Sequence, residues 1–409
     1  MCLERELNRQ DISRLFVHRL NSITKPNNTM AKRVALLTNF IPPYRQALYE
    51  AIAKKVDDFQ VFISTPMEPN RQWKPNWGSL NVKVQKTLTI QRAWRHPHGF
   101  SEPLYVHIPY DTLWLLHEYQ PDVLISGELG MRSLLSLLYR KWSSKSRLIL
   151  WATISEYSEQ GRGKLREQLR KFLLPQADAV LVNGESGARY VRGYGVAPEK
   201  IFVAPYTTEI SPFTALPLSK EANQVYTLLY VGQLIERKGL LLFISALARW
   251  GEAHRDRTLE FLIVGEGSLR STLEQQVLPP NISLSFVGNL AYSDLPQVYE
   301  QGGIFVFPTL ADEWGLVVNE AMAAGLPVLG SLYSQAVEEL VSDGENGWIF
   351  RPDDLEEAYS ALERTLSTSP EELARMRSVA RSRIQNLTHE WVSDAILRAI
   401  HSAMGCKNQ

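Results

Sequence analysis

The feature that most constrains the fold is an alternation of short, continuously apolar runs with segments of helical spacing. From residue 33 onward the runs RVALLTNF, FQVFIST, DVLISG, RLILWAT, AVLVNG and IFVAP recur between turn residues, and helical segments such as 44–56 and 165–174 separate several of them. Strands that are apolar along their whole length are typical of parallel sheets covered by helices on both faces. The first half of the chain therefore predicts an α/β domain with a doubly wound sheet.

The alternation breaks where Pro212, Pro217 and polar residues predict a linker, and then it begins again. The second series is TLLYVGQL, LEFLIVGEG, ISLSFVGN, GIFVFP, LPVLGS and GWIF, with helical segments between the runs. We expect two Rossmann-like domains that face each other across a cleft, because ligands bind at the strand ends of such sheets. The predicted parts are an extension over 1–29, a first domain over 31–212, a linker over 213–223, a second domain over 224–387 and a final segment over 388–409.

Composition excludes several classes of protein. The chain has 44 basic and 44 acidic residues, so no strong field indicates nucleic-acid binding. Its two cysteines, Cys2 and Cys406, predict neither a disulfide framework nor a cysteine metal site. No apolar run approaches the ~20 residues that span a bilayer. Residues 1–29 mix acids with cations, so they predict either a poorly ordered extension or an upstream start ahead of Met30, rather than a signal peptide. A cytoplasmic protein is expected.

The stretch ADEWGLVVNEAMAAGLPVLG (311–330) carries the clearest candidate site. Asp312 and Glu313 fall in a loop between a predicted strand and a predicted helix over 316–324, and Glu320 lies about one turn, roughly 6 Å, into that helix. Helix-start amides favour an anion, and carboxylates accept hydrogen bonds from hydroxyls, so the loop suits a ligand with phosphates and hydroxyls. The alternative is that the acids only cap the helix. Glu320 stands among apolar and small residues, and if buried it needs a partner.

Two further turns support an anion site. In YVGQLIERKG the cations Arg237 and Lys238 precede Gly239 at a predicted helix start, where the helix dipole disfavours cations unless an anion is shared. The alternative is a pair of solvated surface cations. In VGEGSLRSTL the glycines Gly265 and Gly267 resemble the start of a dinucleotide fingerprint, but the third glycine is missing, so the turn is weak evidence for NAD.

These motifs together resemble a known family. VGQL with ERKG, VGEGSL, FVGN, FPTLADEWGLVVNEAMAAGLPV and DGENGWIF stand in the order and spacing of the retaining glycosyltransferases of the GT-B fold, glycosyltransferase family 4. The resemblance covers most of 31–400 and is strongest in the second domain. Its most specific element is the pair of acids, Asp312 and Glu320, separated by seven residues. Asp312 stands where the family usually has Glu.

The resemblance implies a nucleotide-diphosphate sugar as donor, a saccharide or lipid-linked sugar as acceptor, and no cofactor. Asp312 would hold hydroxyls of the donor sugar, Lys238 would neutralise the leaving diphosphate, and Glu320 would bind the ribose. Arg237 would assist, because Gln233 occupies the position of a common arginine. The other implied donor-binding residues are Gly288 near the base, the backbone of Gly315, Leu316 and Val317 at the diphosphate, and the neighbouring Glu313 and Trp314.

The first domain departs from the family pattern. The segment IPPYRQ replaces a Gly-Gly phosphate loop, and Arg45 within it is either a substitute phosphate ligand or an exposed surface residue. Glu128 stands near the position of a family histidine. We include Glu128 among the catalytic candidates. Either Glu128 or Glu156 would orient the acceptor or the donor. The alternative is that they are polar residues at the rim. The last helix, over 389–404, would return to the first domain, as in other GT-B enzymes.

The implied reaction builds charge on the leaving diphosphate, so fixed cations and amides are its main stabilisers. A retaining front-face route lets a donor phosphate oxygen accept the acceptor proton. No D-x-D triplet occurs, so no metal is expected. The alternatives are a sugar-nucleotide epimerase of the same fold, a glycosidase with paired carboxylates, and a non-catalytic glycan- or nucleotide-binding protein.

Two segments of the first domain bear on the acceptor. Aromatic and histidine side chains crowd residues 73–107, and for each of them we expect core packing or loop anchoring, although they would also suit a sugar acceptor; they are Trp73, Trp77, Trp94, His96, His98, Phe100, Tyr105 and His107. No metal-ligand spacing is present among the histidines. The stretch SLLSLLYRKWSSKSR (133–147) is typical of an ordinary amphipathic helix with a basic end; the other possibility is peripheral contact with the inner membrane face.

Overall fold

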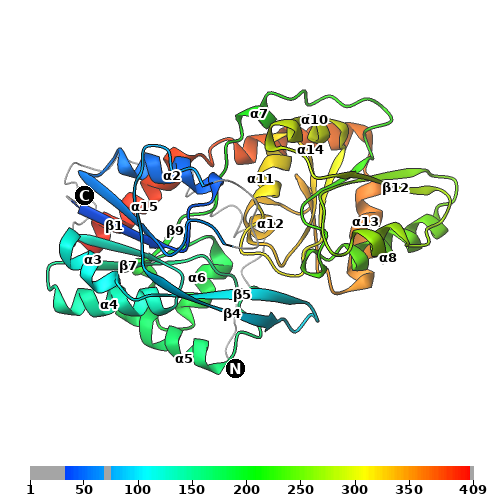
Figure 1. Ribbon diagram of the computed structural model, residues 1–409. Helices are drawn as coiled ribbons and strands as arrows, with labels where there is room; N and C mark the ends of the chain where they lie inside the picture. Colours follow the sequence, from blue (N-terminus) through cyan, green and yellow to red (C-terminus); the bar gives the residue numbers. More distant parts are fainter. Residues whose placement is uncertain (1–32, 69–74, 406–409) are drawn as a thin grey trace, which may run out of the picture. The chain divides into compact units, whose positions relative to one another are not determined.

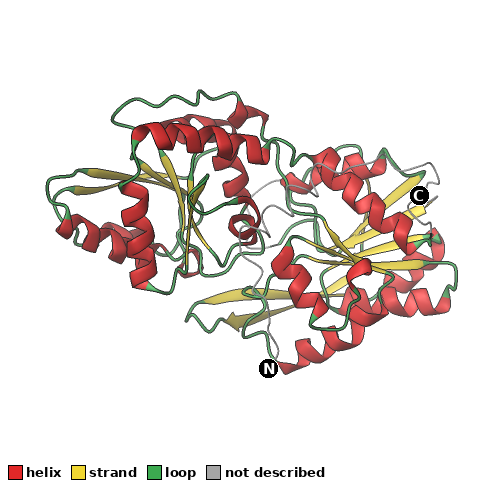
Figure 2. Ribbon diagram, turned by 180° about the vertical axis from the view of Figure 1, so that it is seen from behind, coloured by secondary structure: helices red, strands yellow, loops and turns green. Residues whose placement is uncertain are grey.

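The computed structural model describes residues 33–68 and 75–405, which form two compact units (Figure 1). The first unit extends to Thr208 and takes in the segment from Thr388 onward; the second is Glu209–Leu387. Both sheets are parallel and flanked by helices (Figure 2), which confirms the predicted α/β class with two Rossmann-like halves. The predicted extension 1–29, Trp73 and both cysteines lie outside the described residues.

The first unit is built on a sheet with the strand order β3-β2-β1-β6-β7-β8-β9. Its central strands are buried, because nearly all of their side chains are apolar. Strands β1 and β6 are paired in the middle of the sheet, with Val34 opposite Val123. The strands are β1 (Arg33–Thr38), β2 (Asp58–Ile63), β3 (Asn81–Val84), β6 (Val123–Gly127), β7 (Arg147–Ala152), β8 (Ala179–Val182) and β9 (Ile201–Val203).

Helices cover both faces of this sheet. One face carries α2 (Pro43–Ala53) and α15 (His389–Ala403). Lys55, just after α2, holds α15 through Glu390 and Asp394, each 2.7 Å from its Nζ. The other face carries α3 (Thr112–Tyr119), α4 (Met131–Trp142), α5 (Lys164–Leu173) and α6 (Glu185–Arg192).

An antiparallel hairpin that the sequence did not predict projects from this unit, formed by β4 (Thr87–Arg95) and β5 (Ser101–Pro109). Its turn end is anchored by aromatic and histidine side chains, which is the anchoring role expected for them. His96 stacks on Phe100 at 4.4 Å, and the Trp94 indole donates to the Gln160 carbonyl at 3.0 Å.

The second unit has the strand order β12-β11-β10-β13-β14-β15. Its core packs apolar side chains of the strands against α8 and α13, with Phe243, Trp250 and Phe261 at its centre. The strands are β10 (Leu228–Val231), β11 (Leu259–Val264), β12 (Ile282–Gly288), β13 (Ile304–Phe307), β14 (Val328–Ser331) and β15 (Gly347–Phe350). The helices are α7 (Ser211–Thr214), α8 (Leu240–Ala253), α9 (Arg270–Glu274), α10 (Leu295–Gln301), α11 (Leu316–Ala323), α12 (Gln335–Leu340), α13 (Leu355–Leu366) and α14 (Pro370–Ile384).

The segment expected to be a linker is packed against the second unit. Helix α7 lies at its start and contacts α10 and α11, and Lys220 donates to the Glu300 carbonyl at 2.6 Å. The boundary between the units therefore falls earlier than 213–223, at Thr208. The proline and polar composition indicated a break between the two series of apolar runs, but it could not show which surface this segment rests on.

Close backbone contacts order the carboxyl edge of this sheet. The Gly232 amide donates to Val264 O at 3.0 Å, and the Gly265 amide donates to Gly288 O at 2.8 Å. A Cβ at Gly265, where φ is +131°, would lie 1.9 Å from the Gly232 carbonyl oxygen. Gly265 therefore allows the turn after β11 to contact the turn after β10 closely. This contact accounts for the glycine without a bound dinucleotide.

We expect Gly265→Ala to lower the free energy of unfolding of the second unit by about 3 kcal/mol or more, because backbone cannot move aside cheaply. Gly344→Ala is the matched control: φ is also positive, at +80°, but a Cβ there meets nothing within 4 Å. Its cost should be about 1 kcal/mol, from the backbone conformation alone. Urea unfolding measures both, and equal costs would contradict the close-contact explanation.

Candidate active site

The loop after β13 is fixed by the loop after β14. The Asp312 amide donates to Tyr333 O at 3.1 Å, and the Ser334 hydroxyl donates to Trp314 O at 2.5 Å. The Gln335 side chain donates to Glu313 O at 2.8 Å. These bonds place the acidic loop at the carboxyl edge of the sheet, as the sequence predicted.

A compact charged cluster forms where this loop meets the ERKG turn, a 3₁₀ turn labelled η3 (Glu236–Lys238). Lys238 Nζ lies 2.5 Å from Asp312 Oδ2, and Arg237 Nη1 lies 3.5 Å from the same oxygen. Burial acts to raise the pKa of Asp312, but the charges of Lys238 and Arg237 outweigh it and hold that pKa below its ordinary value. The structure thus brings the three residues together, with Asp312 ionised.

The geometry of the turn explains how two cations come to lie beside a helix start. Gly239 has φ +70°, and a Cβ there would lie 2.1 Å from Pro308 O. Only glycine lets η3 approach the end of β13 this closely. Arg237 Nη1 also donates to Ala311 O at 3.0 Å, and its carbonyl accepts from the Leu310 amide at 2.8 Å. Arg237 therefore ties the two loops together, whereas Lys238 presents its charge to Asp312.

The start of α11 adds an electropositive backbone surface next to this cluster. Gly315 precedes it with φ +111° and supplies no side-chain cap. The first-turn amides of a helix lack acceptors within the helix and attract anions. Gly315, Leu316 and Val317 are partly exposed, whereas Val318 onward is buried. The accessible part of the helix is therefore the part to which the family resemblance assigns a diphosphate.

Glu320 lies in the interior, at 4% exposure, on the second turn of α11. Its Oε2 accepts a hydrogen bond from the Tyr299 hydroxyl at 3.0 Å. Burial raises the pKa of Glu320 to about 7, against the opposing effect of hydrogen bonds from Tyr299 and Tyr292. The sequence required a partner for this carboxyl group, and the structure identifies the two tyrosines.

The remaining predicted donor residues of this unit surround the same edge. The Trp314 side chain is buried, with its indole donating to Asn319 Oδ1 at 2.9 Å, so it supports the loop from inside. Glu313 is partly exposed on the loop. Gly288 ends β12 with φ +83°, and a Cβ there would lie 3.3 Å from Glu266 Oε1.

In the first unit, Glu128 follows β6 in a left-handed conformation, with φ +66° and its side chain 53% exposed. The Asn39 amide donates to its carboxylate, and Arg132 Nη1 lies 3.9 Å from Oε2. Arg132 is buried and also donates to Asn39 Oδ1 at 2.5 Å and to Ser64 Oγ at 2.7 Å. An exposed carboxylate is thus oriented by a buried cation.

Asn39 and Arg132 are functional candidates that sequence reasoning missed. Asn39 directly follows β1, and Glu128 follows β6, which is the neighbour of β1 in the sheet. Polar residues at the carboxyl ends of parallel strands lie close together. That rule was available from sequence. Glu156, the other carboxylate considered, forms an ion pair with Arg189 of α6 at 2.7 Å.

Of the two roles expected for Arg45, that of an exposed surface residue is wrong. It is 5% exposed, and its guanidinium lies 4.5 Å from the Trp151 ring and 3.9 Å from the Tyr206 ring. Its Nη1 is buried with no hydrogen-bond partner among the described residues. Aromatic faces attract the cation, which explains why it can be buried without a carboxylate.

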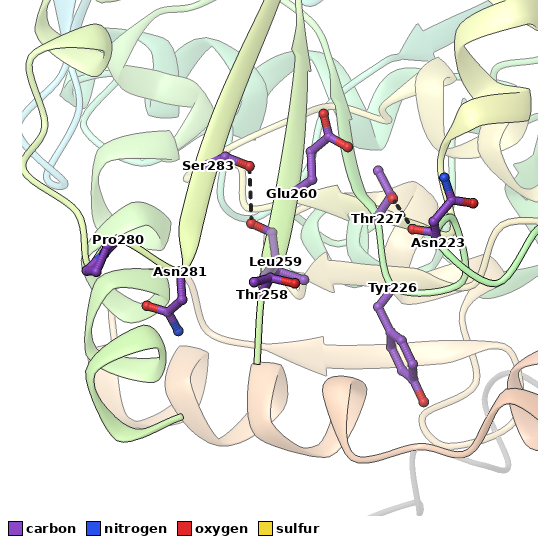
Figure 3. A pocket seen from close by; sticks show the side chains of 9 residues that line it. All are labelled: Asn223, Tyr226, Thr227, Thr258, Leu259, Glu260, Pro280, Asn281 and Ser283. Carbon is purple, nitrogen blue, oxygen red and sulfur yellow. Dashed lines mark hydrogen bonds between the residues drawn. The ribbon is translucent and has the colours of Figure 1, made fainter. Parts of the chain in front are cut away.

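A pocket of about 320 Å³ lies elsewhere, at the amino ends of β10, β11 and β12 (Figure 3). Most of its polar side chains are bonded within the protein: Thr227 donates to Asn223 O at 3.2 Å and Ser283 to Leu259 O at 3.4 Å. Ligands of such sheets bind at the opposite edge. Across 33–68 and 75–405, no group of three or more His, Cys, Asp or Glu side chains is arranged to hold a metal ion.

Comparison with solved structures defines the class of fold. The chain superposes on the Anabaena protein HepE in complex with UDP with a TM-score of 0.68, at 18% identity, over 90% of this chain and all of that one. A lipopolysaccharide outer core galactosyltransferase, WaaB, gives 0.68 at 16% identity, over 90% of this chain and 99% of that one. The fold is that of the GT-B glycosyltransferases.

Sequence comparison places the chain in a family. Residues 225–368 match the model described as "Glycosyl transferases group 1", and residues 41–207 match a "Glycosyl transferase 4-like domain". An uncharacterized glycosyltransferase of Haemophilus influenzae is 30% identical over 76% of this chain and 86% of its own length. The sulfoquinovosyl transferase SQD2 of Arabidopsis thaliana is 30% identical over 62% of this chain, but the chain spans only 49% of that protein. The chain belongs to the group 1 glycosyltransferases, as its motifs indicated.

Glu320 gives the site a pH-dependent stability. Its pKa of about 7 in the folded protein lies above its ordinary 4.5, so the folded state binds the proton more tightly. The stabilisation is complete below pH 4.5 and is lost as pH rises through 7. Between pH 5 and 8 we expect the free energy of unfolding of the wild type to fall by about 2–3 kcal/mol through this group. The Glu320→Gln variant should not show this loss.

Urea unfolding at several pH values measures this difference. Glutamine keeps an acceptor for Tyr299, so the variant should fold. The control is Glu221→Gln, at an exposed position in the same unit, which should follow the wild type. Parallel curves for the wild type and Glu320→Gln would contradict the assignment.

Proposed function

We propose that this chain transfers a sugar from a nucleotide-diphosphate sugar to a saccharide or lipid-linked acceptor, with retention of configuration, in glycan or polysaccharide biosynthesis. The observation that carries the proposal is the contact of Lys238 with Asp312 beside the open first turn of α11. One carboxylate, one flexible cation and a set of amides in one place match the hydroxyls and the diphosphate of such a donor.

The roles follow from this arrangement. Asp312 accepts hydrogen bonds from donor-sugar hydroxyls, and the amides of Gly315, Leu316 and Val317 hold the diphosphate. Lys238 is 12% exposed at its side chain, on a flexible stem, and it turns from Asp312 to the diphosphate when the donor binds. Glu320 binds the ribose. Because its carboxylate already bonds to tyrosine, the ribose hydroxyls replace the contact with Tyr292, which is 48% exposed.

The chemical step breaks the bond between the anomeric carbon and the diphosphate oxygen. Negative charge grows on the diphosphate, where Lys238 and the helix amides stabilise it. The acceptor oxygen forms the new bond on the same face of the sugar, and its proton passes to an oxygen of the leaving diphosphate. No protein base is needed for that transfer.

The first unit contributes the acceptor side of the reaction. Glu128 is exposed, rigidly held by Asn39 and Arg132, and strained in its backbone, a combination that clusters at functional sites. We assign it to orient the acceptor hydroxyl. Arg45, whose buried Nη1 has no hydrogen-bond partner within the described part of the chain, is suited to an anionic group of a substrate.

UDP is the first candidate for the donor nucleotide, because the structurally similar HepE binds it. Thermal unfolding with UDP-, GDP-, ADP- and CMP-sugars tests the donor. Binding at a hundredfold excess over Kd should stabilise the fold by about 2.7 kcal/mol. The products formed from the stabilising donor distinguish the alternatives. An epimerase would convert this donor without an acceptor, and a binding protein would leave it unchanged. Either result would replace the transferase proposal.

We expect Lys238→Ala to lower kcat by about 10²–10³-fold while the Kd for the nucleoside diphosphate changes much less, because charge on the diphosphate increases in the transition state. Lys238→Arg retains the charge and serves as the matched control for the position, with circular dichroism to verify folding. A folded Lys238→Ala enzyme with unchanged kcat would remove this role from Lys238.

We also expect activity to survive excess EDTA. The chain has no D-x-D triplet, and the phosphate charge is assigned to Lys238 and to backbone amides. The measurement is the initial rate of transfer before and after chelation. Loss of activity that Mg²⁺ or Mn²⁺ restores would show that the diphosphate site is incorrectly assigned.

A further inference from the structure

Three cations gather in the second unit where the segment 216–220 rests on α14. They are Lys220, Arg377 and Arg381. The two arginines are four residues apart on α14, so they share one face of that helix. Arg381 Nη2 donates to Leu216 O at 2.8 Å, which fixes this face against the segment. Burial and the charges of the two arginines lower the pKa of Lys220 to about 8, so the three charges lie close together.

Two of these cations have partners of an ordinary kind. Lys220 Nζ donates to Tyr299 O at 3.3 Å and to Glu300 O at 2.6 Å, in the last turn of α10. Arg381 Nε donates to Ala323 O at 2.9 Å, at the end of α11. Cations are favourable at helix C-termini, because the last carbonyl groups lack donors within the helix. Since α10 and α11 lead into β13 and β14, these contacts place the cations at the amino edge of the sheet, opposite the edge that carries Asp312.

Arg377 has no such partner. It is 3% exposed, and its Nε and Nη2 are buried with no hydrogen-bond partner among the described residues. Burial lowers the pKa of Arg377, with an opposing effect of Tyr226. A buried charge is costly unless it is paired. The second unit therefore keeps a cation in its interior that no carboxylate of the described chain neutralises.

The two unpaired atoms indicate which kind of ligand would fit. Nε and Nη2 form the edge of a guanidinium group that binds two oxygen atoms of one anion side by side. Arg140 uses this edge elsewhere in the chain, where Nε and Nη2 donate to the two oxygens of Asp178 at 3.2 and 2.8 Å. Within 33–68 and 75–405, neither Lys220 nor the two arginines form an ion pair. An external oxyanion would therefore meet an unused binding edge and no competing acid on it.

We propose that Lys220, Arg377 and Arg381 form a site for free inorganic phosphate, separate from the site assigned to the sugar donor. Arg377 binds two phosphate oxygens through Nε and Nη2, and Lys220 turns from the α10 carbonyls to the anion on its flexible stem. Lys220 and Arg381 are partly exposed, so phosphate reaches Arg377 from the surface when the lysine moves. The binding edge is enclosed, which favours a small free anion over a phosphate ester.

The bound phosphate links two parts of the second unit that are far apart in the sequence. Segment 216–220 follows Glu209, where the chain enters this unit, and α14 precedes Leu387, where the chain leaves it. Phosphate between them stabilises the entry segment on the exit helix. The inference thus assigns to phosphate a regulation of the stability of this unit, and it does not depend on the proposed transfer reaction.

The test is thermal unfolding of the full chain in inorganic phosphate and in chloride, at matched ionic strength and at pH 7, where Lys220 is charged. We expect phosphate at a hundredfold excess over its Kd to raise the Tm of the second unit by about 5 °C or more. Arg377→Met removes the charge from a long side chain and should weaken phosphate binding about tenfold or more. In chloride this variant should be at least as stable as the wild type, because an unpaired buried cation has been removed.

The matched control is Arg375→Met on the same helix, since Arg375 is 53% exposed at its side chain and pairs with Glu372. It should keep the wild-type shift, and so should Lys238→Ala, which removes the cation of the donor site. Lys220→Gln retains a donor for the α10 carbonyls and should lose most of the shift, so it tests the site even if Arg377→Met does not fold. Phosphate also stabilises proteins by exclusion from their surface. Equal shifts in all variants would show that effect alone and overturn the proposal, as would no shift in the wild type or a shift that only Lys238→Ala abolishes.

Discussion

The ion pair of Lys238 with Asp312 is the contact on which the candidate site depends. It joins two loops that belong to different strand–helix units of the second sheet, and both side chains are 12% exposed. A charge held this far from water needs a partner, and removing one member leaves the other at a high cost. Gly239, which lets η3 approach Pro308, and Arg237, which bonds to the backbone of the loop after β13, hold the pair in place. The positive charge is therefore positioned before any substrate binds.

The first unit repeats this principle with different residues. Arg132 is buried and orients the exposed carboxylate of Glu128 through Asn39, as Lys238 and Arg237 orient Asp312 in the second unit. In each case a cation anchored in the fold fixes a carboxylate at the carboxyl edge of a parallel sheet, where such folds bind ligands. Helix α11 is likewise anchored behind an accessible end, because its first turn is partly exposed while Glu320 on its second turn is bonded to Tyr299 in the core.

The strands and the acidic loop could be predicted from the sequence because their causes are local. A continuously apolar run such as the IFVF of β13 has no other stable position than a buried strand. The site around Arg45 could not be predicted, because Trp151 and Tyr206, which enclose it, come from distant parts of the chain. The β4–β5 hairpin was missed because its exposed strands lack an apolar run. The need for a partner of Glu320 followed from sequence, but the choice of Tyr299 depends on the packing of α10 against α11.

The most direct test of the central claim is a crystal structure of the chain with a bound nucleoside diphosphate. We expect the diphosphate to contact Lys238 Nζ and the amides of Leu316 and Val317, and the ribose to contact Glu320. A diphosphate bound away from the start of α11, for example in the pocket at the amino ends of β10, β11 and β12, would contradict the assignment of this loop as the donor site.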